Sequence, residues 1–337
     1  MNKFKSCLSG GIARIRDARK PNAYRLWATI ASFGLAFIFT FVAARAQSPE
    51  SFSLEPAADD IAVQDNTTID FVPPTVFQAA GPDVASIQGS VDAFRAALGN
   101  PNNGNAGSLM TGHREINWDG AGGADTSTTA PVTPFNVFLN TRGSQFTTPG
   151  IGLSQAPPSG GAQGGLAVLF NNPSYATIFR PFSNFRLFTP VGSNITETLF
   201  FLPGSGGNTP ATVTGFGAVF TDVDQPDGSG PGKKRGNRGA STLMTFFGAN
   251  GELLFSSFVP ASPGDGSLSF FGIKFGDARI ARVRITTGDV APGPDDDSKN
   301  DIVMMDDFIY GEPQAAPVTI PTGEVEQAIY DSTEPPQ

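Results

Sequence analysis

Aspartates at the ends of apolar runs are the residues of this 337-residue chain whose type and spacing best suit chemistry. Asp222 and Asp224 are two residues apart, so both side chains point to one side of an extended strand. Asp306 follows an apolar run, in which an unpaired carboxylate is costly. Ca²⁺ prefers such oxygen ligands and accepts about six to eight of them. We therefore expect a calcium site that includes Asp222, Asp224 and Asp306; the alternative is that these acids cap turns at loop ends.

Two further charged runs stand in Gly/Pro-rich sequence. Residues 295–297 are all aspartates and lie close to Asp301, a pattern that is usually solvated surface. The run 233–238 holds four cations in six residues and could hold an anionic polysaccharide, lipid headgroup or phosphate. No aromatic residue interleaves these cations, so we expect an exposed insertion instead.

Trp118 is a candidate for ligand contact because it stands between Asn117 and Asp119. Flat aromatic faces bind sugar rings, and neighbouring amides and carboxylates can orient the sugar hydroxyls. The pattern is therefore typical of a lectin-like contact that involves Trp118 and Asn117. The alternative is a tryptophan in the core with a satisfied N–H group, which is the commoner situation.

Catalysis has little support in the sequence. His113 is the sole histidine, which argues against a zinc site and a Ser-His-Asp arrangement. No Gly-x-Ser-x-Gly, His-Glu-x-x-His, Walker or dinucleotide motif occurs. Glycoside hydrolysis needs only two carboxylates, which Glu115 with Glu197 or Asp222 could supply. We expect a protein without catalytic residues, with a glycoside hydrolase as the catalytic alternative.

Composition indicates the fold class that must position these residues. The chain has 40 glycines and 28 prolines, which resist the interiors of helices and central strands. It also has 29 phenylalanines and only 16% charged residues, which excludes a helical bundle or coiled coil and favours a turn-rich β protein. The net charge of −9 excludes nucleic acid as a partner, because phosphate binding needs concentrated positive charge.

The N-terminus predicts export. A basic stretch precedes residues 26–44, which carry no charge, and Ala44-Arg45-Ala46 has the small-x-small pattern of a cleavage site. Residues 1–46 are therefore expected to be an export signal, and the alternative is an uncleaved membrane anchor. Removal of this segment takes away Cys7, the sole cysteine, and leaves 14 basic against 30 acidic residues, a net charge of −16. We expect a secreted or periplasmic protein without a disulfide.

Residues 47–82 are rich in Pro, Asp and Thr and are expected to be a linker or loose arm. Residues 83–112 are expected to form an amphipathic helix and a loop, because Val84, Ile87, Val91, Phe94 and Leu98 fall on one helical stripe that ends at Gly99. Residues 113–313 are expected to form a β-sandwich, and residues 314–337 a disordered tail. The predicted strands of the sandwich lie at 135–139, 144–146, 166–170, 178–179, 185–187, 194–202, 213–222, 241–247, 252–259, 268–275, 280–286 and 302–310.

Three motifs in this part carry a resemblance to a known family. They are Gly215-Phe216-Gly217-Ala218-Val219-Phe220-Thr221-Asp222, Val303-Met304-Met305-Asp306-Asp307-Phe308 and Arg114-Glu115-Ile116-Asn117-Trp118-Asp119-Gly120. Together they resemble the jelly-roll domain of uncharacterised exported bacterial proteins, which is similar to carbohydrate-binding modules and in some relatives precedes a PEP-type sorting signal. The resemblance implies an antiparallel jelly roll in an exported protein, and it nominates Asn117, Asp119 and Asp306 for a structural calcium. We also expect Arg114 to contact the ligand together with Asn117 and Trp118.

The sequence as a whole predicts an exported protein that binds a glycan or another extracellular polymer and holds a structural calcium. A structural or adhesive surface protein with no small ligand is the alternative. A membrane partner is expected only if the signal stays uncleaved.

Overall fold

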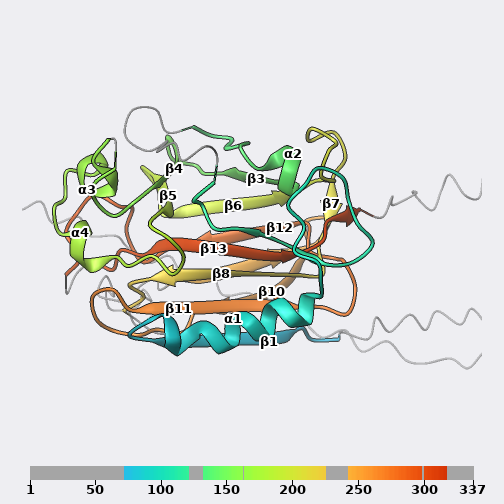
Figure 1. The fold of residues 1–337 in the computed structure, drawn as a ribbon, viewed down its shortest axis with the longest axis horizontal. Coiled ribbons are helices and arrows are strands. Elements are labelled where there is room, and N and C mark those ends of the chain that lie inside the picture. The colour runs from blue at the N-terminus through green and yellow to red at the C-terminus, as the bar shows by residue number, and fades with distance from the viewer. Residues whose placement is uncertain (1–71, 121–131, 162, 225–241, 298–299, 317–337) are drawn as a thin grey trace, which may run out of the picture. The chain divides into compact units, whose positions relative to one another are not determined.

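The computed structural model describes residues 72–120, 132–161, 163–224, 242–297 and 300–316. The expected export signal, most of the expected arm, the basic run 233–238 and most of the expected tail lie outside these described residues. The described part is mainly β, and every pairing between its named strands is antiparallel (Figure 1).

Two large sheets contain most of the strands. Sheet A runs in the order β1 (Thr75–Gly81), β11 (Leu268–Lys274), β8 (Gly215–Thr221), β13 (Met304–Gly311), β5 (Leu187–Val191) and β4 (Gly152–Ala156), and β2 (His113–Ile116) also pairs with β13. Sheet B runs in the order β10 (Leu253–Phe258), β9 (Leu243–Phe247), β12 (Arg282–Thr286), β6 (Ile195–Phe200) and β3 (Ser144–Thr147). A separate pair consists of β7 (Ala211–Thr212) and β14 (Gln314–Ala315).

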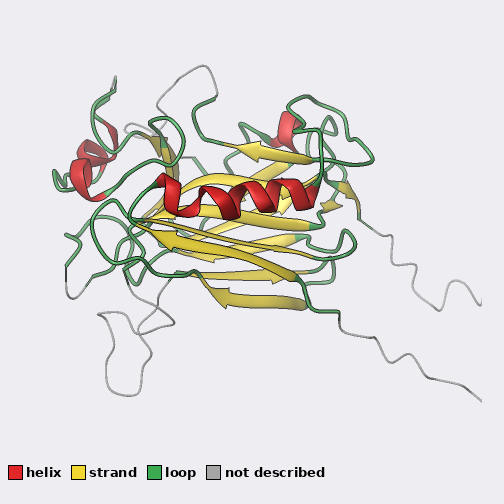
Figure 2. Ribbon diagram, turned by 60° about the horizontal axis from the view of Figure 1, so that its bottom comes forward, coloured by secondary structure: helices red, strands yellow, loops and turns green. Residues whose placement is uncertain are grey.

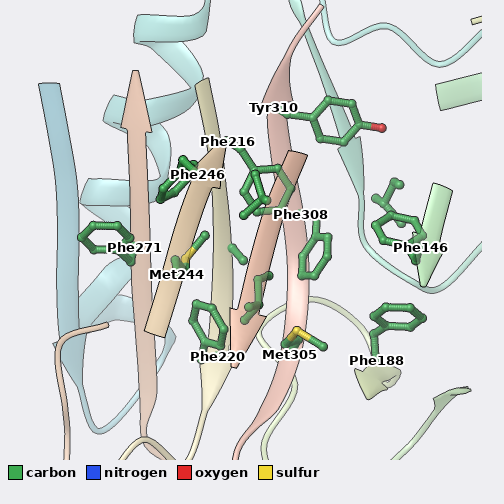
Figure 3. Close-up of a cluster of buried hydrophobic side chains, with 14 of the residues drawn as sticks. Phe146, Phe188, Phe216, Phe220, Met244, Phe246, Phe271, Met305, Phe308 and Tyr310 are labelled. Atoms are coloured by element: carbon green, nitrogen blue, oxygen red, sulfur yellow. The ribbon is translucent and has the colours of Figure 1, made fainter. Parts of the chain in front are cut away.

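The inner faces of the two sheets pack against each other. Strand β8 alternates, so Phe216 and Phe220 point toward sheet B while Val219 points away from it. Figure 3 shows these phenylalanines, together with Phe308 of β13, grouped with Phe246 of β9. Aromatic side chains therefore fill the space between the sheets, which accounts for much of the phenylalanine content.

Helix α1 (Val84–Leu98) covers the outer face of sheet A (Figure 2). Asp83 caps its start by accepting a hydrogen bond from the Ser86 backbone N–H at 3.0 Å, and the helix ends before Gly99. The buried residues of the helix are those of the predicted stripe: Ile87, Val91, Phe94 and Leu98. Phe94 fits closely because Gly217 lies beneath it, and a Cβ atom there would be 2.9 Å from the ring.

Short helices replace two of the predicted strands. The predictions at 166–170 and 178–179 are wrong, because these residues form α3 (Gly165–Leu169) and α4 (Tyr175–Ile178). Gly164 and Gly165 both have positive φ and turn the chain into α3, and the Leu166 N–H then donates to the Pro157 carbonyl. The apolar side chains of these helices pack on Leu187 and Met304 instead of entering a sheet.

The boundaries of the fold differ from the predicted domains at both ends. Strand β1 lies inside the stretch predicted to be a linker, and it pairs with β11 over seven residues. Strand β14 lies inside the predicted tail. The run 135–139 contributes one bridge, Phe135 to Phe146, and then enters α2 (Leu139–Arg142). The remaining predicted strands overlap strands of the structure, and those from 194 onward match in order.

Candidate ligand and cation sites

The four aspartates predicted to share one metal site belong to two separate groups. Asp119 and Asp306 meet at Ser183, beside the junction of β2 and β13. Asp222 and Asp224 follow the end of β8 and interact with Asp296. Within the described ranges, no three His, Cys, Asp or Glu side chains form a ready-made metal site. The structure therefore does not bring these four residues together as one ready-made site.

Asp306 anchors a loop through its carboxylate. Its Oδ2 accepts from the Phe182 backbone N–H at 2.6 Å, and its Oδ1 accepts from the Asp307 backbone N–H at 2.8 Å. The Ser183 hydroxyl lies 3.4 Å from Asp306 Oδ1 and 3.3 Å from the Asn117 carbonyl oxygen. Burial and the neighbouring Asp307 raise the pKa of Asp306 well above its ordinary value. The residues that the resemblance nominates are thus close together, but the Asp306 carboxylate already accepts hydrogen bonds from the backbone.

Arginine and histidine pair with two further carboxylates beside this first group, Glu115 and Asp307. Arg95 of α1 lies 2.8 Å from Glu115 and 3.5 Å from Asp307. His113 lies 3.0 Å from the same Glu115 carboxylate. Burial raises the pKa of Glu115, but the hydrogen bonds and charges of His113 and Arg95 lower it by more, so the net pKa is below its ordinary value. The sequence did not indicate this ion-pair network, because Arg95 is 20 residues from Glu115.

One carboxylate pair considered for glycoside hydrolysis, Glu115 with Glu197, is divided between the two sheets. Glu115 faces α1 on the outer side of sheet A, whereas Glu197 lies in β6 of sheet B and pairs with Arg282 at 2.6 Å and Arg284 at 2.7 Å. A general acid needs a raised pKa, and that of Glu115 is lowered. The structure therefore does not support the pairing of Glu115 as acid with Glu197.

Trp118 belongs to the core, so its assignment as a ligand contact is wrong. The side chain is fully buried and stacks on Phe188 with a ring-centroid distance of 3.7 Å. Phe146 and Phe308 contact it edge-on. Neighbouring Asn117 is exposed but approaches Asp119, not an open aromatic face. The structure bears out the core position of Trp118 but not the satisfied N–H group, because the indole Nε1–H has no hydrogen-bond partner among the described residues.

Arg114 is also buried, which corrects its assignment to a ligand site. Its guanidinium donates to both carboxylate oxygens of Glu312, at 3.0 and 2.7 Å. The remaining donors reach backbone carbonyl oxygens of Asn103, Asn105, Gly107 and Thr141. Arg114 therefore holds the loop before β2 in place.

The second acidic group is short of positive charge. Asp222 and Asp301 are each 1% exposed, and neither carboxylate accepts a hydrogen bond of standard geometry within the described part. Asp296 accepts from the Ile302 N–H at 3.1 Å, and Asp224 accepts from the Gly264 N–H at 2.9 Å. None of these four aspartates forms an ion pair with a described lysine, arginine or histidine.

Burial and mutual repulsion raise the pKa values in this second group. Burial is the main cause for Asp301, whose pKa rises to about 8, and the charges of Asp296 and Asp224 add to it. Asp222 and Asp296 are raised as well, mainly by burial, and they lie within hydrogen-bonding distance of each other. The sequence predicts that residues 295–297 and Asp301 are solvated surface. For Asp301 this prediction is wrong, because its side chain is buried.

The outer face of sheet B carries polar and aromatic side chains in two rows across all five strands. The strand registers place the first row as Gln145, Leu199, Arg282, Phe247 and Leu253, and the second as Thr147, Glu197, Arg284, Thr245 and Ser256. None of these side chains is fully buried. The Arg282 guanidinium lies 3.9 Å from the centre of the Phe247 ring. A pocket of about 410 Å³ adjoins the first row at Leu199, Arg282 and the hairpin turn at Asn250.

Comparisons with protein-family models, with curated proteins and with solved structures find no match to this chain. Among the described residues, no helix is long and apolar enough to cross a membrane. Function is therefore argued from the geometry of the chain itself.

Proposed function

We propose that the chain is an exported, non-catalytic binding protein with a jelly-roll fold, which holds a glycan or another extracellular polymer on the outer face of sheet B. The two rows of side chains on that face carry the proposal. Export is supported by the sequence of residues 1–46, with its basic start, uncharged stretch and small-x-small end.

The strand order supports the jelly roll. An eight-stranded jelly roll has two sheets with the orders 1-8-3-6 and 2-7-4-5. If β5, β6 and β8–β13 are numbered 1 to 8 along the chain, sheet A contains 1-8-3-6 and sheet B contains 2-7-4-5. Of the other strands, β1, β3 and β4 extend these sheets at their edges, β2 lies beside β13, and β7 and β14 form a separate pair.

The outer face of sheet B has the chemistry that recognises sugars. Arg282, Arg284 and Glu197 form a joined set of donors and acceptors, and such groups can orient sugar hydroxyls. Phe247 and Leu253 supply apolar surface in the neighbouring strands. Two arginines share one carboxylate, which leaves a net positive charge on this face of an acidic protein. Acidic polysaccharides are therefore the expected ligands.

A glycan array and titrations with soluble polysaccharides test the proposal. We expect the wild-type chain to bind acidic polysaccharides, and Arg284→Ala and Phe247→Ala to weaken binding by at least about tenfold. Arg279→Ala is the matched control, because this exposed arginine pairs with Asp277 outside the two rows. Absence of binding above background to any polysaccharide would refute the proposal and favour a spacer or matrix protein.

A further inference from the structure

Three loops bring acidic residues to one end of the sandwich. Asp222 and Asp224 begin the loop after β8, Asp265 lies in the loop before β11, and Asp289, Asp296 and Asp301 lie in the loop between β12 and β13. The loops contact one another directly. The Asp222 N–H donates to the Ser267 carbonyl at 3.0 Å, which joins the first two loops, and the Asp222 side chain lies within hydrogen-bonding distance of Asp296 in the third loop. Within the third loop, the Asp301 N–H donates to Asp289 Oδ1 at 2.8 Å.

The burial of two of these carboxylates sets this end apart. Asp222 and Asp301 are both nearly inaccessible to solvent, yet neither accepts a hydrogen bond of standard geometry from a described group. Burying a carboxylate is costly unless a charge or several donors offset the loss of water. At the junction of β2 and β13, Arg95 and His113 pair with Glu115 and Asp307, and backbone N–H groups donate to Asp306. No described cation pairs with the second group.

We propose that Asp222, Asp296 and Asp301, with Asp224 beside them, bind a divalent cation, and that the cation is Ca²⁺. These side chains do not form a ready-made metal site, so binding would draw them together around the ion. All the available ligand atoms are oxygens, which favours Ca²⁺ or Mg²⁺ over the transition metals. One oxygen of Asp224 and one of Asp296 hold backbone N–H groups, so each side chain is already oriented and keeps a second oxygen for a ligand. Ca²⁺ takes most of its ligands from protein oxygens, whereas Mg²⁺ keeps several waters, and a buried set of carboxylates therefore suits Ca²⁺.

A bound cation would connect loops that come from different parts of the chain. The strands before and after these loops belong to both sheets, so the complete site exists only in the folded sandwich and a bound ion would stabilise that state. This inference does not depend on polymer binding, because the acidic end and the outer face of sheet B share no residue.

Thermal unfolding and equilibrium dialysis of the full chain test the site. We expect one bound Ca²⁺ per chain and a rise in Tm of about 5–10 °C between EGTA and a hundredfold excess of CaCl₂ over its Kd. Equal MgCl₂ should give a smaller rise. In Asp222→Asn and Asp301→Asn the calcium-dependent rise should vanish, while Tm in EGTA should stay the same or increase because a repelling buried charge is gone. Asp92→Asn, on the exposed side of α1, is the control and should keep the full rise.

Other outcomes overturn the proposal. Identical melting curves in EGTA and CaCl₂ would do so, as would a calcium-dependent rise that survives in both Asp222→Asn and Asp301→Asn. If both variants instead lose stability equally with and without calcium, these carboxylates have a structural role only. A further outcome would also contradict the site. If calcium has no effect on the wild-type chain, and the chain loses stability when Lys233, Lys234, Arg235 and Arg238 are changed to Gln, then these basic side chains, and not a cation, balance the charge of the aspartates.

Discussion

Replacement of Glu312 by Gln should destabilise the protein more than any change of an exposed ion pair. Glu312 is 4% exposed and Arg114 is fully buried, so their two hydrogen bonds lie away from water. The substitution removes the negative charge but keeps the shape of the side chain. The guanidinium then stays buried without its counter-charge.

The magnitude follows from this burial. Breaking a buried ion pair on one side costs about 3–5 kcal/mol, because the remaining charge cannot regain water. Arg114→Gln should lower the free energy of unfolding by more, because it also removes the donors that several buried backbone carbonyl oxygens accept from. Each buried acceptor left without a donor adds about 1 kcal/mol or more. Those carbonyls belong to Asn103, Asn105, Gly107 and Thr141.

Urea denaturation measures both variants, and hydrogen exchange follows the loop that Arg114 holds. We expect faster exchange in residues 103–109 in both variants, with the larger effect in Arg114→Gln. Arg279→Gln is the control and should change the free energy of unfolding by less than about 1 kcal/mol, because its partner Asp277 is exposed. If Glu312→Gln costs no more than this control, the reasoning from burial is refuted.

Three further predictions concern the outer side of sheet A. Gly217→Ala should cost about 1–3 kcal/mol in urea denaturation because its Cβ would meet Phe94, whereas Gly89→Ala on the open side of α1 should be neutral or stabilising; equal effects would contradict the close fit. Burial lowers the pKa of His113, but hydrogen bonds raise it by more, to a net value above about 6.5. The stabilisation that protonated His113 contributes is therefore complete below the unfolded-state pKa of about 6.5, and it is lost as the pH rises through the folded-state pKa. The urea midpoint should accordingly fall less steeply above pH 6.5 in His113→Gln than in the wild type. Asp306→Ala should lower Tm by leaving two backbone N–H groups without an acceptor, and it should leave the calcium-dependent rise in Tm unchanged.

Much of the strand pattern could be predicted because its signal is local. In β12 the arginines at 282 and 284 alternate with Val283 and Ile285, and the structure buries the latter two. The hairpin at Asn250-Gly251 also forms, although only Gly251 of this pair has a positive φ, so the turn is not the type I′ turn that the dipeptide suggests. Periodicity and turn residues thus determined the elements but not the turn geometry.

The candidate sites depend on contacts that no local pattern contains. Trp118 could be placed in a core or at a ligand until Phe188, 70 positions later, was known to stack on it. Asp301 resembles a residue of a solvated loop, because the run before it is polar and the apolar run begins only after it, at Ile302. Its burial follows from the loop lying against the end of β8, which depends on the topology of the whole sandwich.

The position of β13 bears on when the protein can fold. This strand is buried along its whole length and pairs with β8, β5 and β2. Its partners come from far earlier in the sequence, as when Phe308 pairs with Ile116 of β2. Sheet A therefore cannot close before β13 is available, and pairings between distant segments make folding slow. The placement of this strand between β8 and β5 thus makes closure of the sheet a late and non-local step in folding.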